Sequence, residues 1–337
     1  MTLEVFMKYK KLDYIKIIKI AAGASISCIF ASLAQLSSPT AAGIITILSI
    51  QNTRRETFSL VLKRVISFFI AFAIAICIFA SMGYHISSIF VYLLLYAFLC
   101  EYFNLQSTLV SNTVLVLHLF LEKSIAPTLL LNELFLLFIG TGCGIFMNLY
   151  MPGNATTIRS CQTDLESVFR KALLQISQAV VSKQKLYCED SYLKELENRL
   201  EQLKTQAYEN YGNSLLSDEQ YFIKYVEMRK HQKELLKNVC HNIHLLDEVP
   251  DQAYMISSFI QEISISFHEH NNTQLLTQKL QLLKENLRQQ PLPVTRTEFE
   301  NRALLYRIVY DLEDFIKLKR NFVEELTPKE LQRFWNN

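Results

Sequence analysis

Two ionisable side chains lie inside long apolar stretches of this sequence. His118 lies in residues 114–119 (VLVLHL), and Glu133 follows Asn132 near the start of a leucine-rich run. A carboxylate can carry a proton and imidazole titrates near physiological pH, so either group could couple proton movement to another process. The alternatives are a Glu133 hydrated at a membrane interface and a His118 satisfied by a neighbouring helix.

A second polar group follows a short apolar stretch. Gln51 and Asn52 end this stretch, and Arg54 and Arg55 come directly after them. A broken membrane helix with a polar, cationic end can receive an anionic carboxylate. The alternative is an ordinary helix end followed by the arginines that cytoplasmic loops carry.

Other spacings favour packing over chemistry. Gly140 and Gly144 are four residues apart, which lets helices approach closely. Cys240 and His244 share a helical face but lack further ligands, and residues 268–270 (HEH) are typical of a solvated helix end. Because a closed metal site needs about four ligands, we expect neither a metal nor another cofactor.

The elements that must position these groups lie in residues 1–155, which hold 10 Lys and Arg and 6 Asp and Glu, against 24 and 26 in residues 156–337. Residues 65–82 carry no charge, which is about the length a helix needs to cross a hydrocarbon core roughly 30 Å thick. Six spans are predicted, of which the second is short enough to be a half-crossing element. They cover residues 20–36, 39–50, 65–82, 86–100, 105–121 and 126–150.

The basic residues predict the orientation of these spans. With a cytoplasmic N-terminus, ten basic residues lie on the inner side and only Lys123 lies outside, which satisfies the positive-inside rule and places both termini in the cytoplasm. The ten are Lys8, Lys10, Lys11, Lys16, Lys19, Arg54, Arg55, Lys63, Arg64 and Arg159. Scattered cysteines without a C-x-x-C pair agree with a reducing compartment for the second half.

Residues 156–337 predict a cytosolic α-helical bundle. Apolar residues recur at helical spacing in 165–180, 193–207, 221–243, 256–267, 276–287 and 305–316. Ser217 with Gln220 and Thr297 with Glu300 have capping-box spacing, and Thr327 precedes Pro328 and Glu330. The whole chain is therefore expected to be all-α, with a polytopic membrane bundle over 1–155 and a cytosolic bundle over 156–337.

Several function classes are not expected. No G-x-x-x-x-G-K-[ST] motif is present, and Gly212 is the single glycine of residues 156–337, so a backbone cradle for phosphates is not predicted. Any transport would then draw on an ion gradient or on a partner subunit. No nucleophile–base or metal constellation predicts an enzyme, and we expect no nucleic-acid partner.

Two sets of residues carry a resemblance to a known family. The first set is residues 41–51 (AAGIITILSIQ) with Arg54 and Arg55, and residues 139–142 (IGTG) running into 148–152 (NLYMP). It resembles the aromatic acid exporter family, within the fusaric-acid-resistance-like membrane proteins. The second set, residues 302–305 (RALL), 311–313 (DLE) and 317–320 (KLKR), resembles the cytosolic helical domain of some bacterial members.

The resemblance implies a multi-pass cell-membrane protein of an efflux-type group and leaves the substrate open. Members often carry glycines after the basic residue that opens the third span, whereas Val65, Ile66 and Ser67 follow Arg64 here. Close helix approach is therefore less expected at that point.

Two functions remain open. The first is a gradient-driven efflux transporter for small amphipathic or aromatic organic anions, embedded in membrane lipid. It would be a homo-oligomer, because six spans form a small unit. The second is a non-transporting membrane anchor whose helical bundle recruits or regulates a partner, since the bundle exceeds half of the chain and is not needed to span a membrane.

Overall fold

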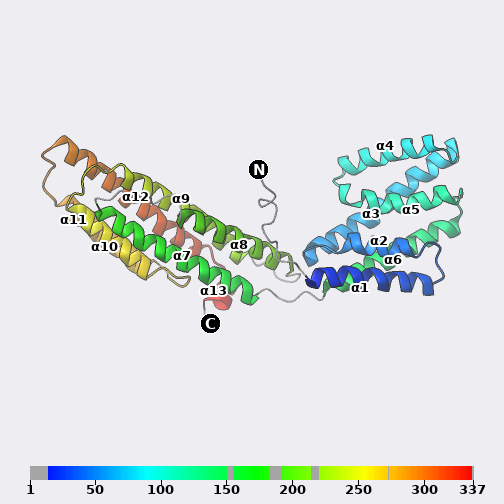
Figure 1. Cartoon of the computed structure of the whole chain (residues 1–337), viewed down its shortest axis with the longest axis horizontal. Coiled ribbons are helices and arrows are strands. Elements are labelled where there is room, and N and C mark those ends of the chain that lie inside the picture. Colours follow the sequence, from blue (N-terminus) through cyan, green and yellow to red (C-terminus); the bar gives the residue numbers. More distant parts are fainter. Residues whose placement is uncertain (1–13, 150–154, 183–191, 214–219, 272, 336–337) are drawn as a thin grey trace, which may run out of the picture. The chain divides into compact units, whose positions relative to one another are not determined.

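The structure is a computed structural model that describes residues 14–149, 155–182, 192–213, 220–271 and 273–335, and each regular element in these ranges is a helix (Figure 1). The predicted all-α class is confirmed. The chain divides into two compact units: Met1–Pro152 with Gly212–Leu215, and Gly153–Tyr211 with Leu216–Asn337. We call them the N-terminal unit and the C-terminal unit.

The described part of the N-terminal unit has one α-helix in each predicted apolar stretch. The helices are α1 (Tyr14–Leu33), α2 (Thr40–Ser49), α3 (Arg54–Met82), α4 (Ile86–Tyr102), α5 (Leu109–Leu121) and α6 (Pro127–Leu149), with a 3-10 turn η2 (Gln106–Thr108) before α5. Three stretches are long and apolar enough to cross a membrane: Lys16–Leu33, Arg54–Met82 and Pro127–Leu149. Residue 150, the predicted end of the last span, lies outside the described ranges.

Helix α3 begins before the predicted third span, at Arg54 instead of residue 65. The cause is Thr53, whose side chain accepts a hydrogen bond from the backbone N–H of Glu56 at 3.3 Å and caps the helix. Arg54, Arg55, Lys63 and Arg64 therefore lie in the first three turns of α3, which corrects their expected place in a loop.

Helix α2 is the shortest α-helix of this unit. Its ten residues rise about 15 Å, which is half the thickness of a hydrocarbon core. Six of its ten residues are nevertheless buried, because α1, α5 and α6 all contact it, while Ile44 and Ile47 are exposed. This length favours the half-crossing interpretation of residues 39–50.

Large apolar side chains cover the outside of the N-terminal unit. Phe90, Phe98 and Phe146 are about two-thirds exposed, at 67, 68 and 70 %. Within the three candidate spans, only 17, 39 and 33 % of the apolar window is buried. Lipid tails solvate such a surface, whereas water does so at a high cost in free energy.

Glycines allow α6 to pack closely against α2. A Cβ added at Gly140 would lie 2.7 Å from Ile45 Cβ and 2.8 Å from the carbonyl oxygen of Ala42, and one at Gly144 would lie 2.5 Å from Ser49 Cβ. Gly142, between them, has no atom within 4 Å of its added Cβ. The two glycines thus lie in the α2–α6 contact and the third lies outside it.

We expect Gly140→Ala to destabilise the N-terminal unit by about 1–3 kcal/mol, because the new methyl group must push α2 away from α6. Gly142→Ala is the matched control and should be neutral or slightly stabilising, since alanine favours a helix. Thermal unfolding of the purified protein in detergent measures both. Equal unfolding temperatures for the two variants would contradict this account of the packing.

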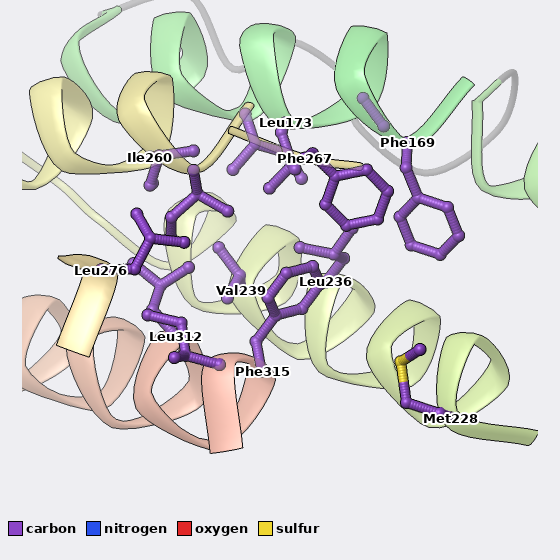
Figure 2. Packing of buried hydrophobic residues seen from close by; sticks show 14 of the residues in the cluster. Phe169, Leu173, Met228, Leu236, Val239, Ile260, Phe267, Leu276, Leu312 and Phe315 are labelled. Carbon is purple, nitrogen blue, oxygen red and sulfur yellow. The ribbon is translucent and has the colours of Figure 1, made fainter. Parts of the chain in front are cut away.

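The described part of the C-terminal unit forms seven helices around one apolar core (Figure 2). Helix α9 packs along α12, and α7 packs along α10. Phe169, Leu236, Phe267 and Phe315 meet between them and are almost completely buried. The helices are α7 (Ala155–Val181), α8 (Tyr192–Asn213), α9 (Tyr221–His244), α10 (Gln252–Ile265), α11 (Gln274–Arg288), α12 (Arg296–Glu324) and α13 (Pro328–Phe334).

The three predicted helix starts have different outcomes. The capping box at Thr327 and Glu330 is confirmed, with both reciprocal hydrogen bonds formed. The start predicted at Thr297 is wrong: α12 begins two residues earlier, because the Thr295 side chain accepts from the backbone N–H of Glu298 at 3.1 Å. Ser217 lies outside the described residues.

Candidate functional site

Arg64 is a fully buried cation at the end of α2. Its guanidinium donates to the carbonyl oxygens of Ile45 and Leu48, each at 3.2 Å, and to the hydroxyl of Ser49. The last four carbonyl groups of a helix have no partner within the helix, so at Leu48 Arg64 supplies a donor that α2 lacks at its C-terminus. The side chain is 0 % exposed.

A polar network continues from Arg64 into α4 and α5. The Asn112 amide donates to the carbonyl oxygen of Arg64 at 3.2 Å and to the Tyr96 hydroxyl at 3.1 Å. Ser67 Oγ lies 2.6 Å from the Tyr96 hydroxyl, and the Thr108 hydroxyl donates to Ser67 Oγ at 2.8 Å. All these side chains are buried. We call Ser49, Arg64, Ser67, Tyr96, Thr108 and Asn112 the Arg64 cluster.

The Arg64 cluster keeps unused hydrogen-bonding capacity. Arg64 Nε and Asn112 Oδ1 are buried, and neither has a hydrogen-bond partner among the described residues. Within the same ranges, Arg64 forms no ion pair with a carboxylate. Buried polar atoms are rarely left unpaired, so this donor and this acceptor are candidates for contacts with a polar ligand or with water.

His118 and Glu133 meet inside the N-terminal unit. His118 Nδ1 lies 2.8 Å from Glu133 Oε2, and the Asn132 amide donates to Glu133 Oε1 at 3.0 Å. Glu133 is 0 % exposed and His118 is half-buried. The simple alternative of a hydrated Glu133 does not describe this arrangement, because both carboxylate oxygens are bonded to side chains. The pair can hold a proton between an imidazole and a carboxylate.

Opposite charges lie at the two ends of α2. Asn132 accepts from the backbone N–H of Ser37 at 2.7 Å and donates to its carbonyl oxygen at 3.2 Å, so Glu133 lies next to the turn that precedes α2. Arg64 lies at the other end. A helix carries partial positive charge at its N-terminus and partial negative charge at its C-terminus, so both side chains complement the dipole of α2.

The polar residues predicted beyond α2 lie apart from the His118–Glu133 pair, at the C-terminal end of this helix. Asn52 Oδ1 accepts from Lys16 Nζ at 2.6 Å, Arg54 donates to the carbonyl oxygen of Leu149 at 2.7 Å, and Gln51 Nε2 donates to that of Leu48 at 3.3 Å. Arg55 is half-buried. These contacts tie the α2–α3 turn to α1 and α6.

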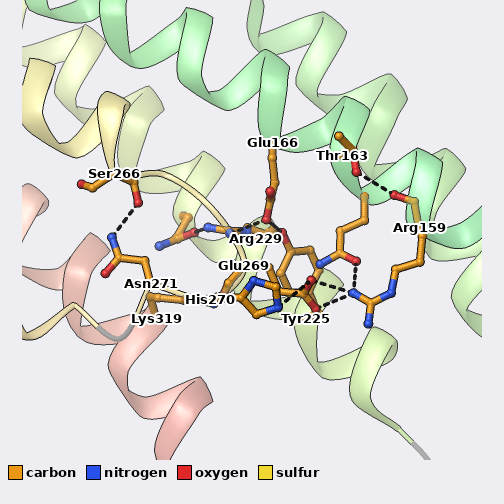
Figure 3. Close-up of polar contacts among 12 residues, drawn as sticks. Arg159, Thr163, Glu166, Tyr225, Arg229, Ser266, Glu269, His270, Asn271 and Lys319 are labelled. Carbon is orange, nitrogen blue, oxygen red and sulfur yellow. Dashed lines mark hydrogen bonds and ion pairs between the residues drawn. The ribbon is translucent and has the colours of Figure 1, made fainter. Parts of the chain in front are cut away.

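The C-terminal unit holds a second buried polar cluster (Figure 3). Arg159 donates to both oxygens of Glu269, at 2.7 and 2.6 Å, and the Tyr221 hydroxyl donates to the same carboxylate. Burial alone would raise the pKa of Glu269, but the hydrogen bonds from Arg159 and Tyr221 outweigh it and lower this pKa. The interpretation of residues 268–270 as a solvated helix end is therefore wrong for Glu269, which is buried, while His268 and His270 are exposed.

Arg229 occupies the aromatic part of the same cluster. Its guanidinium lies 4.1 Å from the ring centroid of Phe267 and 4.8 Å from that of Tyr225. It donates to Glu166 at 3.3 Å, and the Tyr225 hydroxyl donates to the same carboxylate at 2.6 Å. Burial, offset in part by Arg229, raises the pKa of Tyr225, so its hydroxyl remains a donor. These pairings fix α9 against α7 and leave little room for a ligand.

Lys319 is the buried cation of α12. Its ammonium group donates to the carbonyl oxygen of Glu269 and lies 5.2 Å from the ring centroid of Trp335. Burial, reinforced by repulsion from Arg229, lowers the pKa of Lys319 to about 7, although Glu166 and Glu269 oppose the shift. The charged form is therefore costly in the folded protein near neutral pH.

The stability of the C-terminal unit is accordingly expected to rise with pH. The pKa of Lys319 is about 7 in the folded chain against 10.5 ordinarily, so unfolding between these values takes up a proton and becomes harder as the pH increases. Lys319→Met should abolish this rise. Unfolding followed by the fluorescence of Trp335, the one tryptophan of the chain, measures it. The same pH slope in both proteins would contradict the assignment.

Sequence patterns pointed to some of these groups and missed others. His118 and Glu133 were predicted separately, and the structure joins them. Arg64 was counted as one of the cations of the inner side and as the basic residue that opens the third span, but not as a site residue. The sequence signal for a buried Arg64 was its position directly before the 18-residue uncharged run. A cation that adjoins a membrane span usually faces the protein interior and not the lipid.

The chain is similar to known protein families, to a known sequence and to a solved structure. Residues 13–151 match the model of "Aromatic acid exporter family member 1" and residues 156–320 match that of the "Putative aromatic acid exporter C-terminal domain". The chain is 27 % identical over 312 residues to the "Uncharacterized protein YqjA" of Bacillus subtilis, covering 93 % of this chain and 96 % of that protein. It is also similar to the crystal structure of a "putative membrane protein" from Clostridium difficile 630, with 30 % identity, a TM-score of 0.46, and coverage of 51 % of this chain and 99 % of that one.

The two family models cover both units, and the resemblance carried by residues 41–51 and 302–320 is thereby confirmed. The chain belongs to the aromatic acid exporter family and is a membrane protein of this transporter-type group.

Proposed function

We propose that the chain exports small amphipathic or aromatic organic anions across the cell membrane. The observation that carries this proposal is Arg64, a fully buried cation without a carboxylate partner in the described part of an apolar helical unit. Burying a charge in such a unit costs free energy, so a charge that is kept there is a candidate for a functional role. The end of α2 supplies about half a compensating charge, and the remainder favours an anionic ligand.

The unused atoms of the Arg64 cluster fit the chemistry of such an anion. Arg64 Nε is a donor that a carboxylate oxygen accepts, and Asn112 Oδ1 is an acceptor for a hydroxyl or amide group of the same molecule. The stacked rings of Tyr92 and Tyr96, with centroids 5.5 Å apart, adjoin these atoms through the Tyr96 hydroxyl. An aromatic acid matches both the polar and the apolar part of this environment.

The His118–Glu133 pair is the proposed coupling group. Protonation of Glu133 removes its negative charge from beside the turn that precedes α2, where it complements the helix dipole. The equilibrium between arrangements of α2 would then depend on whether the proton is bound. A proton gradient across the membrane would drive export through this dependence.

The charge bias of the sequence supports a proposed location. The ten basic residues assigned to the inner side favour a cytoplasmic position for both termini and for the C-terminal unit. A bundle of about six helices, three of them long enough to span the membrane, is small for a complete path, so the transporting form would be a homo-oligomer in lipid. We assign no catalytic step and no cofactor to the chain.

Release from loaded vesicles tests the proposal. The purified chain is reconstituted into liposomes containing labelled phthalate, an aromatic dicarboxylate that stays charged at neutral pH and crosses bare lipid slowly. Release should be faster than from protein-free liposomes and should increase with an imposed pH gradient. Equal release with and without protein would reject the proposal for this substrate class.

A membrane anchor is the second candidate function. The observation that favours it is the C-terminal unit, which has its own apolar core and exceeds half of the chain. If the chain is an anchor, a cytosolic protein should co-purify with the full chain. Phthalate release from vesicles should then stay at the protein-free rate. Accelerated release excludes a function limited to anchoring.

A further inference from the structure

The C-terminal unit contains a cavity of about 580 Å³ that none of the contacts described above uses. It lies between the end of α11, the segment of residues 289–295, the first half of α12 and the first residue of α10. Pro291 and Pro293 keep the connecting segment extended, because neither can continue a helix. The volume is within the usual range of small-molecule sites, roughly 300–1,000 Å³.

The walls of the cavity are mostly apolar. Leu287 and Leu305 form a buried floor, at 6 and 2 % exposed. Leu292, Phe299 and Tyr306 line it as well, and they remain 87, 61 and 37 % exposed. Side chains of this size are seldom left to water in one place without a ligand or partner. The walls can therefore receive an apolar or aromatic body.

The charged side chains that line the cavity are all positive. The lining residues within the described ranges include two arginines and no carboxylate. Arg302 is held in place by Glu298 and by the carbonyl oxygen of Pro291, whereas Arg288, at the end of α11, is exposed and has no ion-pair partner among the described residues. One cation is thus fixed as part of the wall, and the other is available to a ligand.

A buried amide also faces the cavity. Gln252 is only 6 % exposed and lines the space, yet its side chain has no hydrogen-bond partner in the part of the chain that the structure describes. The amide is not one of the buried unpaired polar atoms of the described chain, so it is open to the cavity, where a ligand or water can bond to it. An exposed guanidinium, an amide open to the cavity and an aromatic wall together suit a small molecule with an anionic group at one end.

We infer that this cavity binds a small amphipathic organic anion, with the anionic group on Arg288 and the apolar body between Leu292, Phe299 and Tyr306. The inference rests on the proposed function only for the expectation that this ligand belongs to the same chemical class as the exported molecule. It is a second site, formed entirely by the C-terminal unit.

Hydrogen–deuterium exchange of the full chain in lipid nanodiscs, with and without 2-naphthoate, tests the inference. Naphthoate should slow exchange in residues 285–306 in a saturable way. Arg288→Gln should weaken the apparent affinity about tenfold or more, because a charge-assisted hydrogen bond is lost. Ala303→Phe, which places a ring in the cavity from an exposed position, should abolish the effect.

Arg296→Gln is the matched control for Arg288→Gln, because Arg296 is an exposed arginine at the start of α12 that does not line the cavity. The apparent affinity of Arg296→Gln for naphthoate should match that of the wild type within about twofold, as expected for a surface position. Protection confined to the N-terminal unit, equal protection in all variants, or protection that appears without naphthoate as the protein concentration rises would overturn the inference. The failure of vesicle release alone rejects the proposed function and leaves this result standing, since exchange reports the cavity separately.

Discussion

Arg64→Met is expected to reduce phthalate release at least about tenfold and to lower the stability of the N-terminal unit by about 3 kcal/mol. The first effect follows from the loss of the buried cation that the anion would meet, since tenfold corresponds to about 1.4 kcal/mol of barrier. The second follows because the carbonyl groups of Ile45 and Leu48 and the Ser49 hydroxyl each lose a charged donor inside the protein. Vesicle release and thermal unfolding in detergent measure the two effects.

Two further variants separate recognition from folding. Arg64→Lys keeps the charge but cannot reproduce the planar fork of the guanidinium, so it should retain part of the release and part of the stability. Lys63→Met removes a cation from the neighbouring, half-buried position of α3 and should change both quantities little. If Lys63→Met lowered release as much as Arg64→Met, the loss of release would be explained by a general effect of charge and not by a specific role of Arg64.

Glu133→Gln is expected to abolish the response of release to a pH gradient. Glutamine has nearly the same shape and can still bond to His118 and Asn132, but it cannot exchange a proton in this range. Gradient-driven release should therefore fall at least about tenfold, while the unfolding temperature changes by a few degrees at most. Release measured at equal and at unequal pH on the two sides of the membrane gives the result.

Glu122→Gln provides the control for Glu133, because Glu122 is an exposed carboxylate at the end of α5. Its pH response should equal that of the wild type. If release by Glu133→Gln still responded fully to the pH gradient, the Glu133 carboxylate would have no part in the coupling step. This conclusion would hold whatever the effect of the substitution on stability.

The helices of both units were predictable because each one has its own local cause. Apolar stretches of membrane length and apolar residues spaced three and four apart specify helices without knowledge of the tertiary structure. The capping box at Thr327 is local in the same sense. The start of α12 was misplaced because Thr295 and Thr297 both have a glutamate three residues later, and spacing alone does not distinguish them.

The candidate site was less predictable because its contacts join distant residues. Arg64 meets the end of a helix 15 to 19 residues earlier and an asparagine 48 residues later. His118 and Glu133 lie on either side of a turn, and the sequence does not give the geometry of that turn. Their contact is therefore known only once both helices have been placed. Glu269 was taken for a solvated residue because its partner Arg159 lies 110 residues away. Patterns within one helix carry no information on such pairings.

Counterflow in reconstituted vesicles tests the central claim most directly, because only a carrier exchanges labelled for unlabelled molecules without a driving force. Vesicles containing the wild-type chain and unlabelled phthalate are diluted into labelled phthalate at equal pH. We predict a transient accumulation of label above its equilibrium level, absent with Arg64→Met. Label that enters wild-type vesicles no faster than protein-free ones, and never exceeds equilibrium, would contradict the account.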